Sequence, residues 1–151
     1  MDIKEQLKEK FKLTDEDLVK PLPVPKKWSK PFWEAAKKHE FLLRKCKDCG
    51  HIDHPPYLYC TNCMSDNLEW FKASGRGTLF AFAINEYAVP YPFMPDLPYV
   101  VALIDLKEGP RMVSNIVKCD HKKLKNGMEL EVVFEDASNE ISLPKWRPLN
   151  K

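Results

Sequence analysis

Four cysteines in two short pairs are the residues of this chain whose chemistry is easiest to name. Cys46 and Cys49 form one Cys-x-x-Cys pair, and Cys60 and Cys63 form the second. Each pair can make a tight turn that directs both sulfurs to one point, and Gly50 supplies backbone freedom that such a turn often needs. Four thiolates make the tetrahedral shell that Zn²⁺ takes in structural sites, so we predict that these four cysteines hold a structural zinc ion.

Other uses of these cysteines remain as alternatives: two disulfides, a redox dithiol, or an iron site. The knuckle Cys-x-x-Cys-Gly also occurs in rubredoxin-like iron sites, but Met64 follows the second pair in place of a glycine, and no other redox group is indicated. His51 and His54 could ligate a metal, yet four cysteines already fill a tetrahedron. A four-thiolate zinc site is closed, so the metal is expected to stabilise the fold and not to catalyse.

No second set of residues predicts catalysis. Cys119 is followed by Asp120 and His121, but neighbours in sequence seldom present their side chains to one another as a nucleophile and its base do. A buried thiol is the better interpretation of Cys119. The chain contains no phosphate-binding glycine loop and no His-Glu-x-x-His or Gly-x-Ser-x-Gly motif. The residues therefore predict a binding or scaffolding protein with no catalytic residue.

Composition narrows the class of protein further. The 151 residues are 44% apolar, enough for a hydrophobic core, and 24 basic against 22 acidic side chains give a net charge of only +2. A dedicated nucleic-acid-binding protein usually has a larger or more clustered basic excess. The first residues are charged, unlike a signal peptide, and no apolar run approaches the about 20 residues that span a bilayer. Cysteines in metal-binding spacing suit a reducing compartment, so we expect a cytoplasmic protein without a membrane span.

The first third of the chain predicts helices that precede the cysteine pairs. Residues 2–12 have the pattern of an amphipathic helix, and Thr14 can begin a second, short helix that a proline-rich connector ends. Ser29 is expected to cap a third helix over residues 30–39. This third helix carries Phe32 and Trp33, which form either a wide core face or a cover for a ligand or partner.

The rest of the chain has the period of β-strands, with a helix-like insert at residues 120–125 after the third strong strand of the second half. Five strands with a short helix in that place match a small Greek-key OB barrel. We therefore predict a mainly β protein with N-terminal helices, in which a rubredoxin-like zinc ribbon precedes a five-stranded OB-fold barrel. The expected parts are residues 1–40 (helical segment), 41–72 (zinc ribbon) and 73–151 (OB-fold domain). The expected strands are 41–45, 68–73, 78–85, 99–106, 111–117, 129–135 and a weak one at 141–143.

A loop at residues 86–98 joins the first two barrel strands and is unusually apolar. It contains four prolines, no glycine, and the large side chains of Tyr91, Phe93 and Met94. In OB domains this loop can close over a ligand. The alternative is that these side chains fold back over the end of the barrel as an additional part of the core.

Several stretches together resemble the DUF35 family of acyl-CoA-associated proteins. The matching stretches are Pro31-Phe32-Trp33-Glu34-Ala35, Cys46 to Gly50, Pro55-Pro56, Cys60 to Cys63, Leu68-Glu69-Trp70, Ser74 to Thr78, Pro98 to Leu103, Glu108 to Arg111 and Gly127-Met128. Where such proteins usually have proline after the first cysteine of the second pair, Thr61 stands here. The resemblance implies a zinc ribbon with an OB fold, a partner of the thiolase or related acyl-CoA enzyme class, and no catalysis by this chain.

An acyl-CoA ligand, if bound as the resemblance implies, needs an apolar groove and cations for its phosphates. The candidates for the groove are Phe32, Trp33, Tyr91, Phe93 and Met94, with nearby lysines for the phosphates. We hypothesise a non-catalytic acyl-CoA-binding or scaffolding subunit with a structural zinc. The alternative is a zinc-ribbon and OB protein that binds single-stranded nucleic acid, but the strands at 78–84 and 99–105 carry no basic residue.

Overall fold

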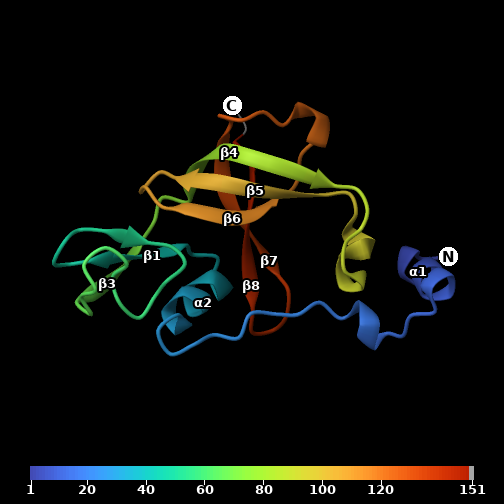
Figure 1. Cartoon of the computed structure of the whole chain (residues 1–151), viewed down its shortest axis with the longest axis horizontal. Helices are drawn as coiled ribbons and strands as arrows, with labels where there is room; N and C mark the ends of the chain where they lie inside the picture. Colours follow the sequence, from blue (N-terminus) through green and yellow to red (C-terminus); the bar gives the residue numbers. More distant parts are fainter. Residues whose placement is uncertain (150–151) are drawn as a thin grey trace.

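A three-stranded sheet and a closed five-stranded barrel carry the fold, and the N-terminal segment runs along one side of both (Figure 1). The computed structural model describes residues 1–149. The expected fold class is confirmed: the protein is mainly β, with N-terminal helices, a ribbon and a five-stranded OB-type barrel.

The ribbon is an antiparallel sheet in the order β2-β1-β3. Strand β1 (Leu42–Cys46) lies between the short β2 (Ile52–Asp53) and β3 (Leu68–Lys72). The buried residues of β1 are Leu43 and Cys46, and Leu43 has 1% of its surface exposed. The last residue of β1 is Cys46, so the strand delivers the first cysteine directly to the cysteine cluster.

The barrel closes in the order β4-β5-β6-β8-β7, which is the strand order of an OB fold. Strand β4 pairs with both β5 and β7, and β6 meets β8 in parallel through Ile116 and Trp146. A short 3₁₀ helix, η3 (His121–Lys123), connects β6 to β7, at the predicted place of the helix-like insert. The barrel strands are β4 (Arg76–Asn85), β5 (Tyr99–Leu106), β6 (Arg111–Ile116), β7 (Glu129–Asp136) and β8 (Ser142–Pro148).

The barrel interior is filled by alternate side chains of these strands. In β5 every second residue is buried, which places Val100, Ala102 and Ile104 inside. Gly77 of β4 lies so close to β5 that a Cβ atom there would be 2.8 Å from Ile104 Cγ2 and 2.9 Å from the Asp105 carbonyl oxygen. Only glycine fits at this position of the barrel wall.

The last strand was predicted too short. Strand β8 extends to Pro148 instead of ending near residue 143, and Trp146 within it is fully buried in the barrel core. Pro144 and Pro148 interrupt the apolar alternation that normally identifies a strand. The pairing with β7 is nonetheless continuous from Ser142 to Pro148.

Two helices and three 3₁₀ turns, including η3, lie outside the sheets within residues 1–149. Helix α1 (Ile3–Phe11) lies beside η2 (Tyr91–Asp96), a turn within the long loop between β4 and β5 (Figure 1). The ring centroids of Phe11 and Tyr91 are 6.1 Å apart. Turn η1 (Glu16–Leu18) also contacts η2. It begins with a reciprocal pair: Thr14 N–H donates to Asp17 Oδ2, and Asp17 N–H donates to Thr14 Oγ1.

Helix α2 (Lys30–Lys37) packs between the ribbon and the barrel. Its expected cap is wrong: Ser29 Oγ accepts a hydrogen bond from the N–H of Lys26 at 2.9 Å and caps nothing in the helix. Pro31 in the first turn compensates, because its missing N–H leaves one fewer donor to satisfy.

One hydrophobic core joins the three parts. Phe41 precedes β1, and its ring lies 5.9 Å from that of Phe32 in α2 and 5.8 Å from that of Trp146 in the barrel. All three side chains are buried in the same cluster. The ribbon, the helix and the barrel therefore share their apolar interior.

No helix within residues 1–149 has the length and apolarity required to cross a membrane.

Candidate functional site

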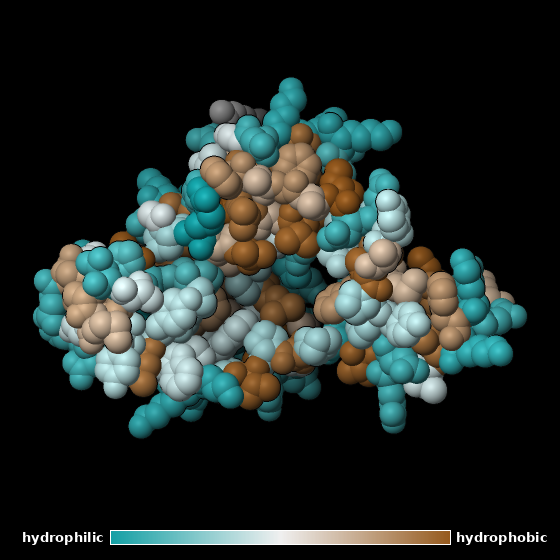
Figure 2. All heavy atoms as spheres, viewed as in Figure 1, coloured by the Kyte–Doolittle hydropathy of each residue, from teal (hydrophilic) through white to brown (hydrophobic). Residues whose placement is uncertain are grey.

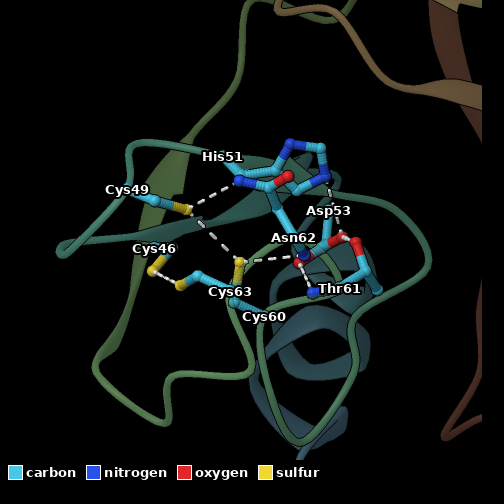
Figure 3. Close-up of polar contacts among 8 residues, drawn as sticks. All are labelled: Cys46, Cys49, His51, Asp53, Cys60, Thr61, Asn62 and Cys63. Atoms are coloured by element: carbon cyan, nitrogen blue, oxygen red, sulfur yellow. Dashed lines mark hydrogen bonds and ion pairs between the residues drawn. The ribbon is translucent and has the colours of Figure 1, made fainter.

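The four predicted metal ligands meet at one end of the ribbon (Figure 3). The Sγ atoms of Cys46, Cys49, Cys60 and Cys63 all lie within 4.8 Å of one another. Cys46 and Cys60 are buried, whereas Cys49 and Cys63 are exposed. None of the four forms a disulfide.

The spacing of the sulfurs fits a tetrahedral metal site. Cys46 Sγ lies 3.6 Å from Cys63 Sγ, and Cys49 Sγ lies 3.6 Å from Cys60 Sγ. A tetrahedron with Zn–S bonds of about 2.3 Å has edges of about 3.8 Å, whereas a disulfide needs about 2.05 Å between its sulfurs. The donor set is therefore suited to a zinc ion held by all four cysteines.

The protonation of the cluster shows why it favours a cation. Donation from Asn62 Nδ2, and from the backbone N–H of His51, lowers the pKa of Cys49 to about 6. The backbone N–H of Ser65 acts in the same direction on Cys63, but hydrogen bonding with the neighbouring Cys49 sulfur raises the pKa of Cys63 to about 12. Negative charge on one sulfur opposes ionisation of the next, so a divalent cation is what allows four thiolates to coexist.

Two similar backbone turns bring the sulfurs together. Gly50 N–H donates to the Cys46 carbonyl at 2.9 Å, and Met64 N–H donates to the Cys60 carbonyl at 3.0 Å. The residue after each pair has a left-handed backbone, with φ of 78° at Gly50 and 62° at Met64. The second turn thus has the conformation of the first, even though methionine replaces glycine there.

A buried carboxylate supports the second turn. Asp53 is 7% exposed and accepts hydrogen bonds from the backbone N–H of Thr61, at 3.3 Å, and from the Thr61 hydroxyl. His51 Nε2 lies 3.3 Å from the same carboxylate (Figure 3). His51 therefore lies outside the sulfur cluster and contacts Asp53, the residue that supports the second turn.

His54 is not part of the cluster either. Its ring lies 5.7 Å from that of Phe32 and 6.1 Å from that of Phe41, and its Nδ1 atom is buried without a partner among the described residues. Burial lowers the pKa of His54 to about 4. The side chain is therefore neutral near pH 7 and serves as part of the aromatic packing.

A hollow of about 440 Å³ lies between α2, the Pro55-Pro56 turn and the barrel strands β6 and β8. The surface between the barrel and the chain segment beneath it is visibly indented (Figure 2). The hollow has the size of a small-molecule site, and most of its lining is apolar. Its walls include Trp28, Phe32, Trp33, Pro56, Val113 and Leu143.

A second and larger hollow, of about 990 Å³, lies beside the first. Its walls come from the N-terminal segment, from η2 and from the ends of β6 and β8. Phe93 and Tyr99 supply aromatic surface, Lys118 and His121 supply basic groups, and Glu135 and Asp136 supply carboxylates. Both hollows are lined by Asn115, Leu143 and Lys145, so they adjoin at these three residues.

The five candidate ligand residues do not gather in one place. Phe32 and Trp33 line the first hollow, although Phe32 is also a core residue with 4% of its surface exposed. Phe93 lines the second hollow. Tyr91 and Met94 line neither, and the ring of Tyr91 packs near that of Phe11.

The residues at the junction were missed by sequence reasoning. Lys145 Nζ donates to Asn115 Oδ1 at 2.6 Å, across 30 residues of sequence. An isolated asparagine and an isolated lysine carry no recognisable motif. Only the placement of β6 beside β8 brings the two side chains together.

Cys119 lies outside both hollows. It is half-buried against the core, and burial, aided by Asp120, raises the pKa of its thiol. A raised pKa disfavours the nucleophilic thiolate, which agrees with the interpretation of Cys119 as a packing residue.

Comparison with known families matches both parts of the chain. Residues 33–69 match the family model described as "ChsH2, rubredoxin-like zinc ribbon domain", and residues 70–135 match "ChsH2, C-terminal OB-fold domain".

Curated relatives carry names of two kinds. A "DUF35 domain-containing scaffold protein" of Pyrococcus furiosus is 33% identical over 138 residues, covering 87% of this chain and 97% of the relative. A "Probable enoyl-CoA hydratase alpha subunit" of Thermomonospora curvata is 32% identical, covering 86% of this chain. "Benzoylsuccinyl-CoA thiolase subunit BbsA" of Geobacter metallireducens is 29% identical, covering 63% of this chain. The chain spans only 40% of the length of the hydratase relative and 57% of the thiolase relative.

A solved structure titled "Ltp2-ChsH2(DUF35) aldolase" is similar to this fold. Its matching chain superposes with a TM-score of 0.75 at 31% sequence identity, covering 84% of this chain and 98% of that one.

Proposed function

The chain belongs to the DUF35 family, and from that premise we propose that it is a non-catalytic subunit that accompanies a thiolase-type enzyme and binds an acyl-CoA. The observation that carries the ligand half of the proposal is the pair of adjoining hollows, one mostly apolar and one with basic groups. An acyl-CoA is amphiphilic in the same sense, with an apolar acyl end and a phosphate-bearing nucleotide end.

The partner half of the proposal is supported by the relatives. One is named as a subunit of a CoA thiolase, one as a subunit of a CoA hydratase, and a similar chain is part of a structure named as an aldolase. Others are named as scaffold proteins. A scaffold that holds an acyl-CoA enzyme and its substrate side by side accounts for both kinds of name.

A non-catalytic role is supported by the hydrogen bonds of the two serine hydroxyl groups that line the first hollow. The Ser114 hydroxyl donates to the Pro144 carbonyl at 2.9 Å, and Ser29 Oγ is bonded to the backbone of Lys26. Neither hydroxyl is paired with a base in the part of the chain that the structure describes. Nucleophilic catalysis needs such a pair, so we assign the chemical step to the partner.

We propose that the cysteine cluster holds zinc in a structural role. The ion would be bound by Cys46, Cys49, Cys60 and Cys63, and four sulfur ligands would leave no open position for substrate. The bound ion would cross-link the two turns that carry the cysteines. The cluster lies on the ribbon, which bears Pro55 and Pro56 of the first hollow, so the metal would stabilise one wall of the groove.

Capture of the partner from native cells tests the proposal. The intact protein is used as bait, and we expect it to retain a thiolase-type enzyme. Cys46→Ser should retain less because the ribbon loosens, while Cys119→Ser is the matched control and should behave as the wild type. Recovery of RNA or ribosomal proteins alone would contradict the proposal and favour nucleic-acid binding. Native mass spectrometry of the purified protein reads bound metal, bound CoA ester and stoichiometry together.

A further inference from the structure

Lys145 occupies the junction of the two hollows, and its charge is poorly compensated. Only 18% of its side chain is exposed. Its short contact is with the neutral amide oxygen of Asn115, at 2.6 Å. The carboxylate of Glu135 is 3.9 Å away, at the outer limit of an ion pair, and is itself half exposed.

Such an ammonium group is suited to receive an anion. Removing a charged amine from water is costly unless an opposite charge or several hydrogen bonds replace the water. Burial accordingly lowers the pKa of Lys145. An anionic group entering the groove at this point would complete the pairing that the protein leaves incomplete.

The surroundings of Lys145 differ on its two sides. The first hollow contains the rings of Trp28, Phe32 and Trp33 and no lysine or arginine other than Lys145. The second contains Lys118 and His121 together with the carboxylates of Glu135 and Asp136. No ion pair of Lys118 is found within residues 1–149. Lys20 also lines it, but its ammonium is already paired with Asp96.

We propose that Lys145 forms the subsite for the pyrophosphate of an acyl-CoA, with the acyl-pantetheine arm in the first hollow and the nucleotide in the second. Asn115 positions Lys145, because its Oδ1 accepts from Lys145 Nζ while its Nδ2 donates to the Val100 carbonyl. This inference rests on the proposed function and fixes the direction in which the ligand lies. Phe93 and Tyr99 offer rings near the adenine, and Lys118 offers a cation near the 3′-phosphate.

Binding of two related probes to the full chain tests the subsite. Octanoyl-CoA carries the pyrophosphate, and octanoyl-pantetheine lacks every phosphate. Lys145→Met keeps the length of the side chain and removes its charge, and Lys122→Met, on the exposed face of η3, is the matched control. We expect Lys145→Met to weaken the binding of octanoyl-CoA at least about tenfold, because a charge-assisted contact is lost. Lys122→Met should change this affinity less than about twofold.

The phosphate-free probe separates a lost charge from a damaged groove. Octanoyl-pantetheine should bind wild type and Lys145→Met equally, and inorganic pyrophosphate should compete with octanoyl-CoA on the wild type alone. Equal octanoyl-CoA affinity in wild type and Lys145→Met overturns the subsite while leaving the proposed acyl-CoA binding intact. Absence of octanoyl-CoA binding by the wild type overturns both the subsite and the proposal that the protein binds an acyl-CoA. The proposed association with a thiolase-type enzyme is then tested separately by the capture experiment.

Discussion

At the scale of single residues, the cysteine cluster depends on a side chain that does not touch the metal position. Asp53 is the buried acceptor for both the N–H and the hydroxyl of Thr61, in the second turn. Groups that hold metal ligands in place from outside commonly change metal affinity by about 10- to 100-fold when they are removed. Asp53 has that position here.

The first prediction concerns this carboxylate. Asp53→Ala leaves the N–H of Thr61 without its acceptor and frees the turn that carries Cys60 and Cys63. Zinc affinity, measured by competition with a chromophoric chelator, should fall about 10- to 100-fold. Asp66→Ala removes an exposed carboxylate close to the same turn and should leave the affinity within about twofold. Equal affinities of the two variants would show that Asp53 does not support the cluster.

The second prediction concerns pH and His54. Burial lowers its pKa in the folded protein to about 4, against about 6.5 in the unfolded chain. The unfolded chain therefore binds more protons between these values, so the contribution of neutral His54 is fully present above pH 6.5 and is lost as the pH falls toward 4. The loss is on the order of 2–3 kcal/mol.

Urea unfolding of zinc-saturated protein between pH 5 and 7 measures this slope. His54→Phe, which fits among Phe32 and Phe41, should be less sensitive to acid than the wild type. A His54→Phe variant as acid-sensitive as the wild type would contradict the assignment.

At the scale of elements, the barrel tolerates no side chain at one point of β4. Gly77 faces Ile104 and the backbone of Asp105 at distances under 3 Å from an added Cβ. We expect Gly77→Ala to destabilise the protein by about 1–3 kcal/mol, since the strands must move apart. Thr78→Ala, at the exposed neighbouring position, should cost less than about 1 kcal/mol. Equilibrium denaturation measures both, and equal stabilities would mean that β4 and β5 are not in close contact there.

The sequence predicts most of the helices and strands but few of the residues that line the two hollows. The cysteine spacing and the strand period predict the ribbon, the barrel and the insert between β6 and β7, because local patterns specify them. Strand β8 was shortened because Pro144 and Pro148 conceal a strand whose buried residue is Trp146. The pair of Asn115 and Lys145 could not be foreseen, since it exists only after distant strands are placed side by side.

Ser29 shows the same limit in a single helix. Its type and position before α2 satisfy the usual rule for a cap, yet its hydroxyl bonds to Lys26 in the preceding turn. A serine can serve the backbone on either side, and the local sequence does not decide between them.

At the scale of the whole molecule, the ribbon and the barrel are joined through Phe41. Its ring is 3% exposed and contacts both Phe32 and Trp146. A metal-stabilised ribbon and a barrel that share an apolar core are expected to lose structure together and not one after the other.

The fourth prediction follows from that shared core. Phe41→Ala should destabilise the protein by about 3–5 kcal/mol and should reduce amide protection in β1–β3 and also in β7–β8. Phe80→Ala removes a ring that is 47% exposed on the outer barrel face and should have a far smaller effect. Hydrogen exchange read by mass spectrometry distinguishes the outcomes: loss of protection confined to β1–β3 would show that the two parts are independent.

The N-terminal segment has a consequence for how members of such a family can diverge. Residues 4 and 18–22 form one wall of the second hollow, and the Lys20–Asp96 ion pair fastens this wall to η2. The two family models match residues 33–69 and 70–135, so this wall lies outside both of them. Substitutions in this wall are therefore expected to change the ligand preference of the second hollow without changing the ribbon or the barrel.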